Sequence, residues 1–333
     1  MFAGNTALVI STNFMRIAEA MHNSQAHPGS GNVIGGSHRG APAAFSFWIM
    51  AARPRTLTLS TTPVVVGAAL AWAAERQVHW LAVLAAFLGA VFIQLGTNIH
   101  NDAADFERGG DGPDRVGPPR VTASGLLTAT AVNRGAIVCF AIAALIGIYL
   151  IAVGGWPILL VGVLSIASAW GYTGGPFPIA YTPLGEVFVV IFFGLVPVGG
   201  TYFLCTAGLS PPALTAGLAL GLLTGAVLLV NNHRDIVSDA RAGRRTLPIV
   251  VGRASTTVIF AVLMLVPFAL LPLIGHHLPH GRVWPAVVAL PGALFVIYRF
   301  AIEPSGPVFN RILVQTVQVQ LAFSLMLSLG LIL

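Results

Sequence analysis

The chain has 333 residues, of which 56% are hydrophobic and only 8% are charged, with a mean hydropathy of +0.84. Because a soluble domain carries about 25% charged residues, this composition excludes an ordinary water-soluble protein and predicts a polytopic membrane protein. The net charge of +6 arises from arginine without any lysine, so the chain contains neither a Schiff-base lysine nor a P-loop. The arginines fall in short loops, which is not the pattern of a nucleic-acid-binding surface.

Residues 1–44 are rich in Gly, Ser, His, Asn and Pro and contain no apolar run of signal-peptide length, so we predict a disordered polar extension. Residues 45–333 predict one all-α membrane domain with nine transmembrane helices. Each is about 20 residues long, as needed to cross roughly 30 Å of hydrocarbon. The predicted spans are 56–74, 79–101, 134–153, 156–172, 184–204, 212–231, 255–275, 284–301 and 312–333.

The distribution of arginine predicts the orientation of these spans. If the N-terminus is cytoplasmic, fifteen of the seventeen arginines fall on the cytoplasmic side, and only Arg76 and Arg282 fall on the other. This asymmetry follows the positive-inside rule. We therefore expect a multi-pass protein of the cell inner (cytoplasmic) membrane, with the ends of the second and sixth spans facing the cytoplasm.

Seven of the eleven acidic residues lie in two short segments, at those two cytoplasmic helix ends. Unpaired charges beside a membrane are costly, so the clustering predicts a shared partner with positive charge. Mg²⁺ that also binds a phosphate fits best, because it prefers carboxylate and amide oxygens together with substrate phosphates.

Each acidic segment, read as a helix, carries polar residues on one face, since positions three and four apart are neighbours. The first stripe comprises Asn98, Asn101, Asp102 and Asp105, and the second comprises Asn231, Asp235 and Asp239. Arginines follow both stripes. We predict that some of them bind diphosphate oxygens through bidentate hydrogen bonds, while others contact lipid headgroups. The candidates for diphosphate binding are Arg108, Arg120, Arg234 and Arg244.

Three segments resemble the motifs of the UbiA superfamily of intramembrane prenyltransferases: Asn101-Asp-Ala-Ala-Asp105, Asp235-Ile-Val-Ser-Asp239 and Gly243-Arg-Arg-Thr-Leu-Pro248. Four further stretches resemble, more narrowly, its MenA branch, the 1,4-dihydroxy-2-naphthoate prenyltransferases. These stretches are 51–57, 117–125, 172–178, and 184–188 with 193–194. The resemblance covers residues 45–333.

The resemblance implies a bundle of nine transmembrane helices around a central cavity that opens toward the cytoplasm and laterally toward lipid. It implies Mg²⁺ as the cofactor and a polyprenyl diphosphate and an aromatic acid as the substrates. The superfamily pattern places an acid at position 109, which is Gly here, and Asp111 is the expected substitute. The superfamily pattern also has a lysine four residues after the tyrosine that corresponds to Tyr172, and this position is Pro176 here. The diphosphate contact that the resemblance assigns to that lysine would fall to an arginine or be absent. The candidate metal ligands are Asn101, Asp102, Asp105, Asp111, Asp235 and Asp239.

The implied reaction is Mg²⁺-dependent transfer of a polyprenyl group to 1,4-dihydroxy-2-naphthoate with decarboxylation, as in menaquinone biosynthesis. Glu186, near the start of the fifth span, is a candidate for substrate positioning or proton transfer, and Arg53 could bind an acidic acceptor. The candidate catalytic residues are Asp105, Asp235, Asp239 and Glu186. The candidate substrate-binding residues are Asn98, Asn101, Arg53, Arg108, Arg120, Tyr172, Asn231, Arg234 and Arg244.

Two other functions remain open from the sequence. The same enzyme class could use another acceptor, such as 4-hydroxybenzoate, homogentisate or a specialised metabolite. A secondary transporter also has many spans and internal repeats, but transporters place ionisable groups near the bilayer midplane. The acidic residues here lie at helix ends beside arginine-rich loops, which favours an enzyme.

Overall fold

The computed structural model describes residues 41–110, 116–276, 278 and 282–333. The predicted extension over residues 1–44 lies almost entirely outside the described residues, and so does the candidate ligand Asp111. Residues Pro42–Leu333 form one compact unit. All regular elements of the described residues are helices, as the composition predicted.

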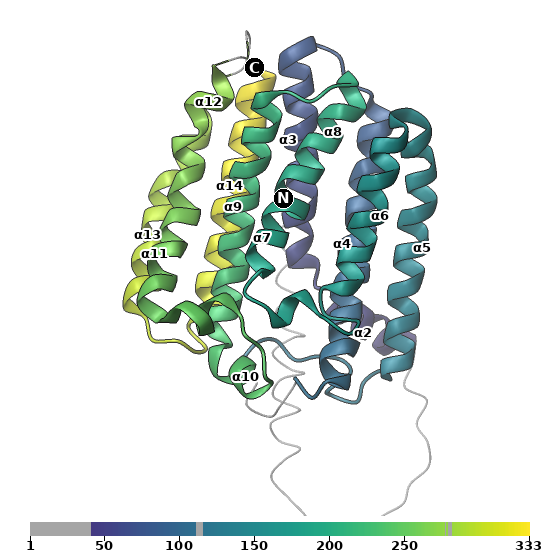
Figure 1. Cartoon of the computed structure of the whole chain (residues 1–333), viewed down its shortest axis with the longest axis vertical. Helices are drawn as coiled ribbons and strands as arrows, with labels where there is room; N and C mark the ends of the chain where they lie inside the picture. Colours follow the sequence, from purple (N-terminus) through teal and green to yellow (C-terminus); the bar gives the residue numbers. More distant parts are fainter. Residues whose placement is uncertain (1–40, 111–115, 277, 279–281) are drawn as a thin grey trace, which may run out of the picture. The chain divides into compact units, whose positions relative to one another are not determined.

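Long apolar helices are connected by loops and by short helical segments. In chain order, the elements are α2 (Ala41–Ala52), η1 (Pro54–Thr56), α3 (Leu57–Glu75), α4 (Trp80–Glu107), α5 (Ala129–Gly154), α6 (Trp156–Gly171), η2 (Ile179–Tyr181), α7 (Gly185–Val190), η3 (Ile191–Leu195), α8 (Val196–Thr206), α9 (Pro211–Arg234), α10 (Ile236–Arg241), α11 (Leu247–Ala269), α12 (Leu271–Gly275), η4 (Trp284–Ala289), α13 (Leu290–Ile302) and α14 (Phe309–Ile332). Figure 1 shows their arrangement.

Every predicted span corresponds to a helical segment of the described chain. Eight of these segments are long and apolar enough to cross a membrane, and α6, with 16 residues, is a shorter apolar helix. The protein is therefore a multi-span membrane protein. The second span extends beyond its predicted end, because the helix continues through the first acidic motif to Glu107. The second motif differs: the helix is interrupted at Asp235, where α9 ends and α10 follows.

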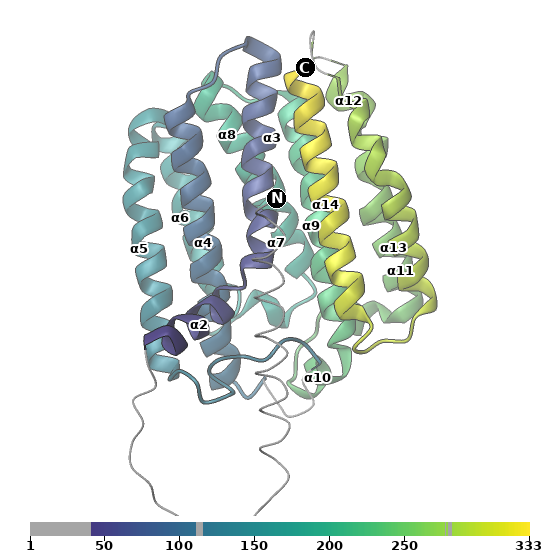
Figure 2. The same ribbon diagram turned by 180° about the vertical axis from the view of Figure 1, so that it is seen from behind.

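Helix α9 occupies the middle of the bundle. Figures 1 and 2 show α4, α5 and α6 on one side and α11, α13 and α14 on the other, with α3, α7, α8 and α9 between them. Glycines bring α9 close to η3: a Cβ atom added to Gly194 would lie 2.2 Å from the carbonyl oxygen of Gly217 and 2.5 Å from the Cα atom of Gly221. Small residues are the usual means of close helix approach in membranes. This contact fixes α9, and with it the second acidic motif.

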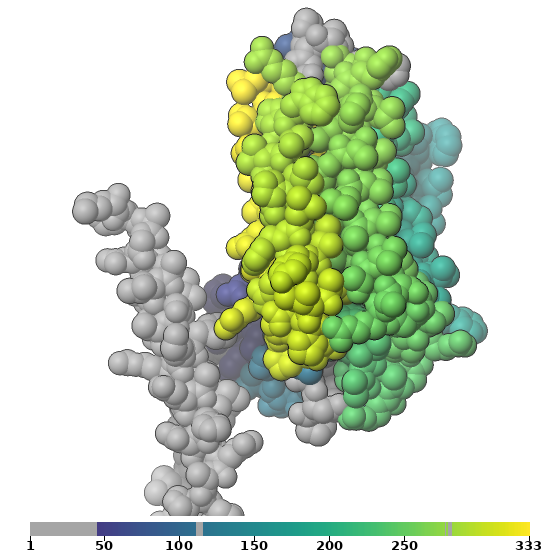
Figure 3. Space-filling view, turned by 90° about the vertical axis from the view of Figure 1, so that its left-hand side faces the viewer, coloured from purple at the N-terminus to yellow at the C-terminus, as the bar shows by residue number. Residues whose placement is uncertain are grey.

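The outer helices expose apolar side chains along their length. Figure 3 shows the face formed by α11, α12 and α13, with α14 in yellow at its edge. Exposed apolar residues of these helices include Val258, Val262, Leu273, Leu294 and Phe295. In water such a surface would be unfavourable, whereas hydrocarbon chains of a bilayer solvate it.

The arrangement of the loops gives a test of topology. The loop that contains Ser124 and the short helix α10 that contains Ala240 lie at the same end of the bundle, whereas Leu209, between α8 and α9, lies at the other. Single cysteines at Ser124 and Ala240, in a chain whose two native cysteines are replaced by alanine, should react with a membrane-impermeant maleimide from the cytoplasmic side only. A cysteine at Leu209 should react from the opposite side only. Labelling of the first two positions from opposite sides would contradict the fold.

Candidate functional site

A cavity of about 600 Å³ runs through the bundle between α3, α4, α6, the α7–α8 segment and α9. One end lies beside the acidic motifs and is lined by Asn101, Asp105 and Asn231, and the other end reaches Leu150 and Leu204 at the opposite side of the bundle. Most of its wall is apolar. The cavity is therefore a long hydrocarbon-lined chamber with one charged end.

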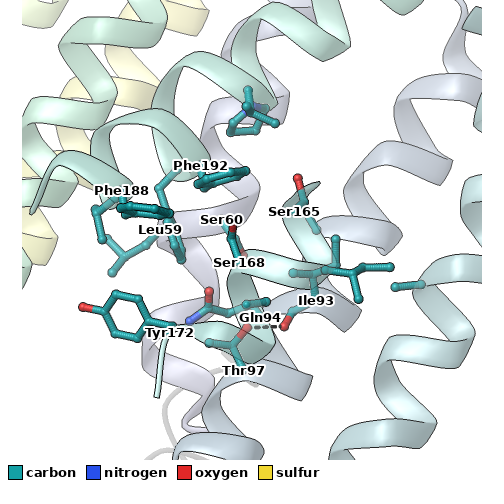
Figure 4. Close-up of a pocket in the computed structure, with 18 of the residues that line it drawn as sticks. Leu59, Ser60, Ile93, Gln94, Thr97, Ser165, Ser168, Tyr172, Phe188 and Phe192 are labelled. Carbon is teal, nitrogen blue, oxygen red and sulfur yellow. Dashed lines mark hydrogen bonds between the residues drawn. The ribbon is translucent and has the colours of Figure 1, made fainter. Parts of the chain in front are cut away.

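Figure 4 shows the middle of this cavity. The rings of Phe188 and Phe192 are stacked with their centroids 5.9 Å apart, and Leu59 lines the same cavity. The hydroxyl groups of Ser165 and Ser168 on α6 also line the cavity, so its wall is apolar but carries a few isolated polar atoms. This is the usual character of a small-molecule site.

The carboxylate of Asp105 lies at the centre of the charged end. Its side chain is 2% exposed and forms ion pairs with two arginines: Arg120 contacts one carboxylate oxygen, and Nη2 of Arg244 lies 2.5 Å from the other. A buried carboxylate without a cationic partner would be strongly unfavourable. Two guanidinium groups from separate loops therefore converge on this one residue of α4.

Arg244 links the two acidic motifs. Its Nη1 atom lies 3.4 Å from Oδ1 of Asp239, while its Nη2 binds Asp105, and its guanidinium lies 4.8 Å from the centre of the Tyr181 ring. Burial lowers the pKa of this guanidinium, but the neighbouring carboxylates of Asp105 and Asp239 raise the pKa more, so that the net direction is upward. Arg244 is thus a permanent positive charge between two carboxylates that are 134 positions apart in sequence (239 minus 105).

Asp102 and Asp235, although adjacent to these residues in the motifs, have other partners. The carboxylate of Asp102 accepts hydrogen bonds from the backbone N–H groups of Val121 (3.2 Å) and Thr122 (2.9 Å), which holds the loop where Arg120 can reach Asp105. Asp235 forms an ion pair with Arg234, whose Nη2 lies 2.6 Å from Oδ2 of Asp235. The carboxylate of Asp102 therefore binds the loop that follows α4, and that of Asp235 binds the last residue of α9.

Arg234 connects α9 to α14 and to the chain that follows the first motif. It donates hydrogen bonds to the side-chain oxygens of Asn231 (2.8 Å) and Asn310 (2.9 Å), and Asn310 donates to the carbonyl oxygen of Val116 (3.1 Å). Arg234 is 5% exposed and does not line the cavity. Its contacts hold the polar end of the bundle together.

The two asparagines of the first motif differ in their surroundings. Asn98 donates to the carbonyl oxygen of Ala52 (2.8 Å) and to the hydroxyl of Thr56 (3.0 Å), which attaches the start of α3 to α4. The side-chain oxygen of Asn101 accepts a hydrogen bond from the hydroxyl of Thr173 at 2.5 Å. Both asparagines line the cavity.

Arg53, Arg108 and Tyr172 lie around the same end. Arg53 lines the cavity from the turn before α3, where its backbone adopts a left-handed conformation (φ 50°) that is unusual for a non-glycine residue. Arg108 donates to the carbonyl oxygen of Gly175 and does not line the cavity. Tyr172 does line it; burial first, and then the nearby carboxylate of Glu186, raise the pKa of its phenol, so it stays protonated.

The structure thus brings together most of the residues that the sequence singled out. Those that line the cavity are Arg53, Asn98, Asn101, Asp105, Arg120, Tyr172, Asn231 and Arg244. Those outside its lining are Asp102, Arg108, Glu186, Arg234, Asp235 and Asp239. Sequence reasoning missed Thr173, Tyr181 and Asn232, although Thr173 follows Tyr172 and Asn232 follows Asn231.

The donor set at the charged end suits a hard divalent cation. Asp105 and Asp239 present carboxylate oxygens on either side of one guanidinium group, and the amide oxygen of Asn101 lies on the same helix as Asp105. Among the described residues, no three His, Cys, Asp or Glu side chains converge. Mg²⁺ needs only one or two protein carboxylates when substrate phosphates complete its coordination, so these residues fit it.

Comparison with known proteins agrees with this geometry. The model of the UbiA prenyltransferase family matches residues 60–305, so the chain belongs to this family of membrane-embedded prenyltransferases. The chain is 40% identical to the 1,4-dihydroxy-2-naphthoate octaprenyltransferase of Mycobacterium tuberculosis over 224 residues, which cover 67% of this chain and 76% of that protein. It is 35% identical to the Escherichia coli protein of the same name over 298 residues, which cover 86% of this chain and 95% of that protein. The chain is accordingly an enzyme of the prenyltransferase class.

Solved structures show the same fold. The structure of a UbiA homolog from Archaeoglobus fulgidus bound to DMAPP and Mg²⁺ matches with a TM-score of 0.63 and 14% identity, covering 86% of this chain and 98% of that one. At this identity the likeness establishes the arrangement of helices and nothing finer. It confirms the bundle that the sequence implied.

The ion pairs of Asp105 lead to a prediction about stability. Replacing Asp105 by Ala leaves the buried guanidinium group of Arg120 and the half-buried one of Arg244 without this partner, so the free energy of unfolding should fall by about 3–5 kcal/mol. Glu303 offers a matched control, because its pair with Arg299 is 20–28% exposed and its loss should cost at most about 1 kcal/mol. Thermal unfolding in detergent without substrate measures both. Equal losses in the two variants would contradict the central role of Asp105.

Proposed function

We propose that this enzyme transfers a polyprenyl group from a polyprenyl diphosphate to 1,4-dihydroxy-2-naphthoate, with loss of the acceptor carboxylate and with Mg²⁺ as cofactor. The observation that supports the proposal most strongly is the pair of carboxylates, Asp105 and Asp239, at the charged end of a long apolar cavity. The names of the curated relatives support the choice of acceptor. The product would then serve menaquinone biosynthesis.

Asp105 and Asp239, with the amide oxygen of Asn101, would hold Mg²⁺. When bound, the ion would neutralise charge that develops on the leaving diphosphate and so assist cleavage of the carbon–oxygen bond. Asp102 and Asp235 would act indirectly, because their carboxylates are engaged with backbone N–H groups and with Arg234. For Asp111 a ligand role stays a prediction.

Arg120 and Arg244 would bind the diphosphate oxygens. Both line the cavity, and each already directs a guanidinium group toward the point where Asp105 and the cavity meet. Bidentate hydrogen bonds from guanidinium to phosphate are strong and directional. Stabilising the departing diphosphate is the largest electrostatic demand of this reaction, and these arginines are positioned to meet it.

The apolar wall would bind the polyprenyl chain and keep water from the allylic cation. The rings of Phe188 and Phe192 and the phenol of Tyr172 line the cavity beyond its charged end. Aromatic faces attract a cation, and a desolvated cavity prevents its capture by water. The hydrocarbon chain would extend toward Leu150 and Leu204, along the length of the bundle.

Arg53 would bind the carboxylate of the acceptor, since it lines the cavity and a guanidinium group can form two parallel hydrogen bonds to a carboxylate. The new carbon–carbon bond forms at the ring carbon that bears the carboxylate. The bond to the carboxylate then breaks, CO₂ leaves, and its electron pair restores the aromatic ring. No ring proton has to be removed, so this reaction requires no general base at that carbon.

The same residues support a proposed orientation of the enzyme. The charged end of the cavity carries the arginine-rich loops, and the positive-inside rule favours a cytoplasmic position for them. Both substrates' charged groups would therefore enter from the cytoplasmic face of the inner membrane, while the prenyl chain reaches the cavity from the bilayer.

Removal of either proposed metal ligand should abolish turnover. Asp105→Asn and Asp239→Asn keep the size of each side chain but remove a negative charge, so we expect prenyl transfer to fall on the order of 10²-fold or more. Turnover should also cease when Mg²⁺ is chelated and return on its addition. Glu303→Gln, at a residue outside the cavity lining, serves as the control in a membrane assay with labelled prenyl diphosphate. Near-normal activity of either aspartate variant would refute the proposed metal site.

The acceptor can be tested through its carboxyl group. With 1,4-dihydroxy-2-naphthoate labelled in that group, we expect equal molar amounts of CO₂ and prenylated product, because one ring carbon loses one group and gains the other. The enzyme should not prenylate 4-hydroxybenzoate. Prenylation of 4-hydroxybenzoate with its carboxylate retained, and no turnover of the naphthoate, would leave the fold intact but overturn the proposed acceptor.

A further inference from the structure

A buried carboxylate lies directly behind the cavity wall. Glu186, the second residue of α7, is 5% exposed and does not line the cavity. Its Oε1 atom accepts a hydrogen bond from Nδ2 of Asn232 on α9 at 2.9 Å, and its Oε2 atom has no hydrogen-bond partner among the described residues. Asn232, in contrast, does line the cavity. The pair therefore connects a hidden acid to an amide that a substrate can reach.

The hydrogen bond determines which way the Asn232 amide faces. Oε1 of Glu186 accepts, so the NH₂ group of Asn232 must point toward it, and the amide oxygen must point away. Within the described part of the chain, no residue donates a hydrogen bond to Oδ1 of Asn232, and this atom is not among the buried atoms that lack a partner. Oδ1 therefore remains able to accept a hydrogen bond from an O–H or N–H donor of a molecule in the cavity that Asn232 lines.

The position of this oxygen matches the reacting part of the substrate. The N-terminus of α7 lies against Tyr172, since a Cβ atom added to Gly185 would be 3.3 Å from the Tyr172 hydroxyl oxygen. Tyr172 and Asn231 line the same cavity and lead to Arg244 at its charged end. The prenyl chain is a hydrocarbon without O–H or N–H groups. A hydroxyl group bound by Asn232 would consequently belong to the aromatic acceptor.

We propose that Oδ1 of Asn232 binds a hydroxyl group of the aromatic acceptor, and that Glu186 is the positioning residue that fixes this amide. The inference rests on the proposed function. In 1,4-dihydroxy-2-naphthoate, the 1-hydroxyl group is adjacent to the carboxylate and hydrogen-bonds to it internally. The 4-hydroxyl group is free to donate, so it is the partner of Asn232. With Arg53 on the carboxylate, two contacts then fix the orientation of the ring.

The experiment compares two naphthoates in the full-length enzyme. 1,4-Dihydroxy-2-naphthoate is the substrate, and 1-hydroxy-2-naphthoate, which lacks the 4-hydroxyl group, is used as a competing ligand whose inhibition constant is measured. Asn232→Leu should raise the KM for the substrate about tenfold, as expected for loss of a buried hydrogen bond. The inhibition constant of 1-hydroxy-2-naphthoate and the KM for prenyl diphosphate should both stay within about twofold, because neither ligand uses Oδ1.

Variants at Glu186 test the positioning role and remain informative if Asn232→Leu does not fold. Discrimination here means the ratio of the inhibition constant of 1-hydroxy-2-naphthoate to the KM for 1,4-dihydroxy-2-naphthoate. Glu186→Gln keeps a side-chain oxygen to which Asn232 can donate, so this discrimination should be largely retained. Glu186→Leu removes that oxygen, and discrimination should be lost as in Asn232→Leu. The matched control is Gln320→Leu, which removes another buried amide of the bundle, bonded to Thr62 at 2.8 Å and outside the cavity. This control should leave the discrimination unchanged.

The outcomes separate the two hypotheses. If the unmodified enzyme does not prenylate 1,4-dihydroxy-2-naphthoate, the proposed function fails, and the inference fails with it. If it does, but Asn232→Leu weakens both naphthoates equally, the proposed function stands and the role of Asn232 is refuted. Retained discrimination in Glu186→Leu would refute the positioning role of Glu186, and lost discrimination in Gln320→Leu would refute the specificity of the effect.

Discussion

The polar end of this enzyme depends on one buried carboxylate. Asp105 is held by Arg120 and Arg244, which belong to the segments that follow the first and second motifs. With Asp239, these four side chains sum to zero formal charge, so the cluster is tolerated beside the membrane. If a divalent cation enters together with a diphosphate, the positive charge of the cation largely offsets the negative charge of the diphosphate. The same arginines can then contact the diphosphate without leaving a large net charge in the bundle.

The position of that cluster is set by packing deeper in the membrane. Hydrocarbon does not drive helices together as water does, so close approach relies on small residues and interhelical hydrogen bonds. In this bundle, Gly194 of η3 lies against Gly217 and Gly221 of α9. The helix α7, which continues directly into η3, is joined to α9 by the Glu186–Asn232 hydrogen bond, nearer the charged end. A side chain at these glycines would separate the helices. Because catalytic geometry is sensitive to shifts of about 1 Å, such a change would reach the site.

The sequence predicted the spans and the first stripe because both depend on local regularities: apolar runs of sufficient length and the helical repeat. It named both Asp102 and Asp105 as candidate metal ligands, because the difference between their partners lies in the loop that folds back so that Val121 and Thr122 donate to Asp102. Asp235 likewise has its own partner, Arg234, at the point where α9 ends and α10 follows. Asn232 was missed because its amide is oriented by a residue 46 positions away, which no local pattern encodes.

Pro176 occupies the position at which the superfamily pattern has a lysine, so the diphosphate contact expected of that lysine would fall to an arginine or be absent. In place of a flexible lysine, the region after Tyr172 provides Tyr181, whose ring lies 4.8 Å from the Arg244 guanidinium and 5.6 Å from that of Arg108. An aromatic face binds a planar guanidinium more specifically than it binds an ammonium group. Tyr181 therefore fixes Arg244 between the two acidic motifs. If Arg244 binds the diphosphate as proposed, the positive charge would come from the segment after α10, and Tyr181, in the segment after α6, would support it.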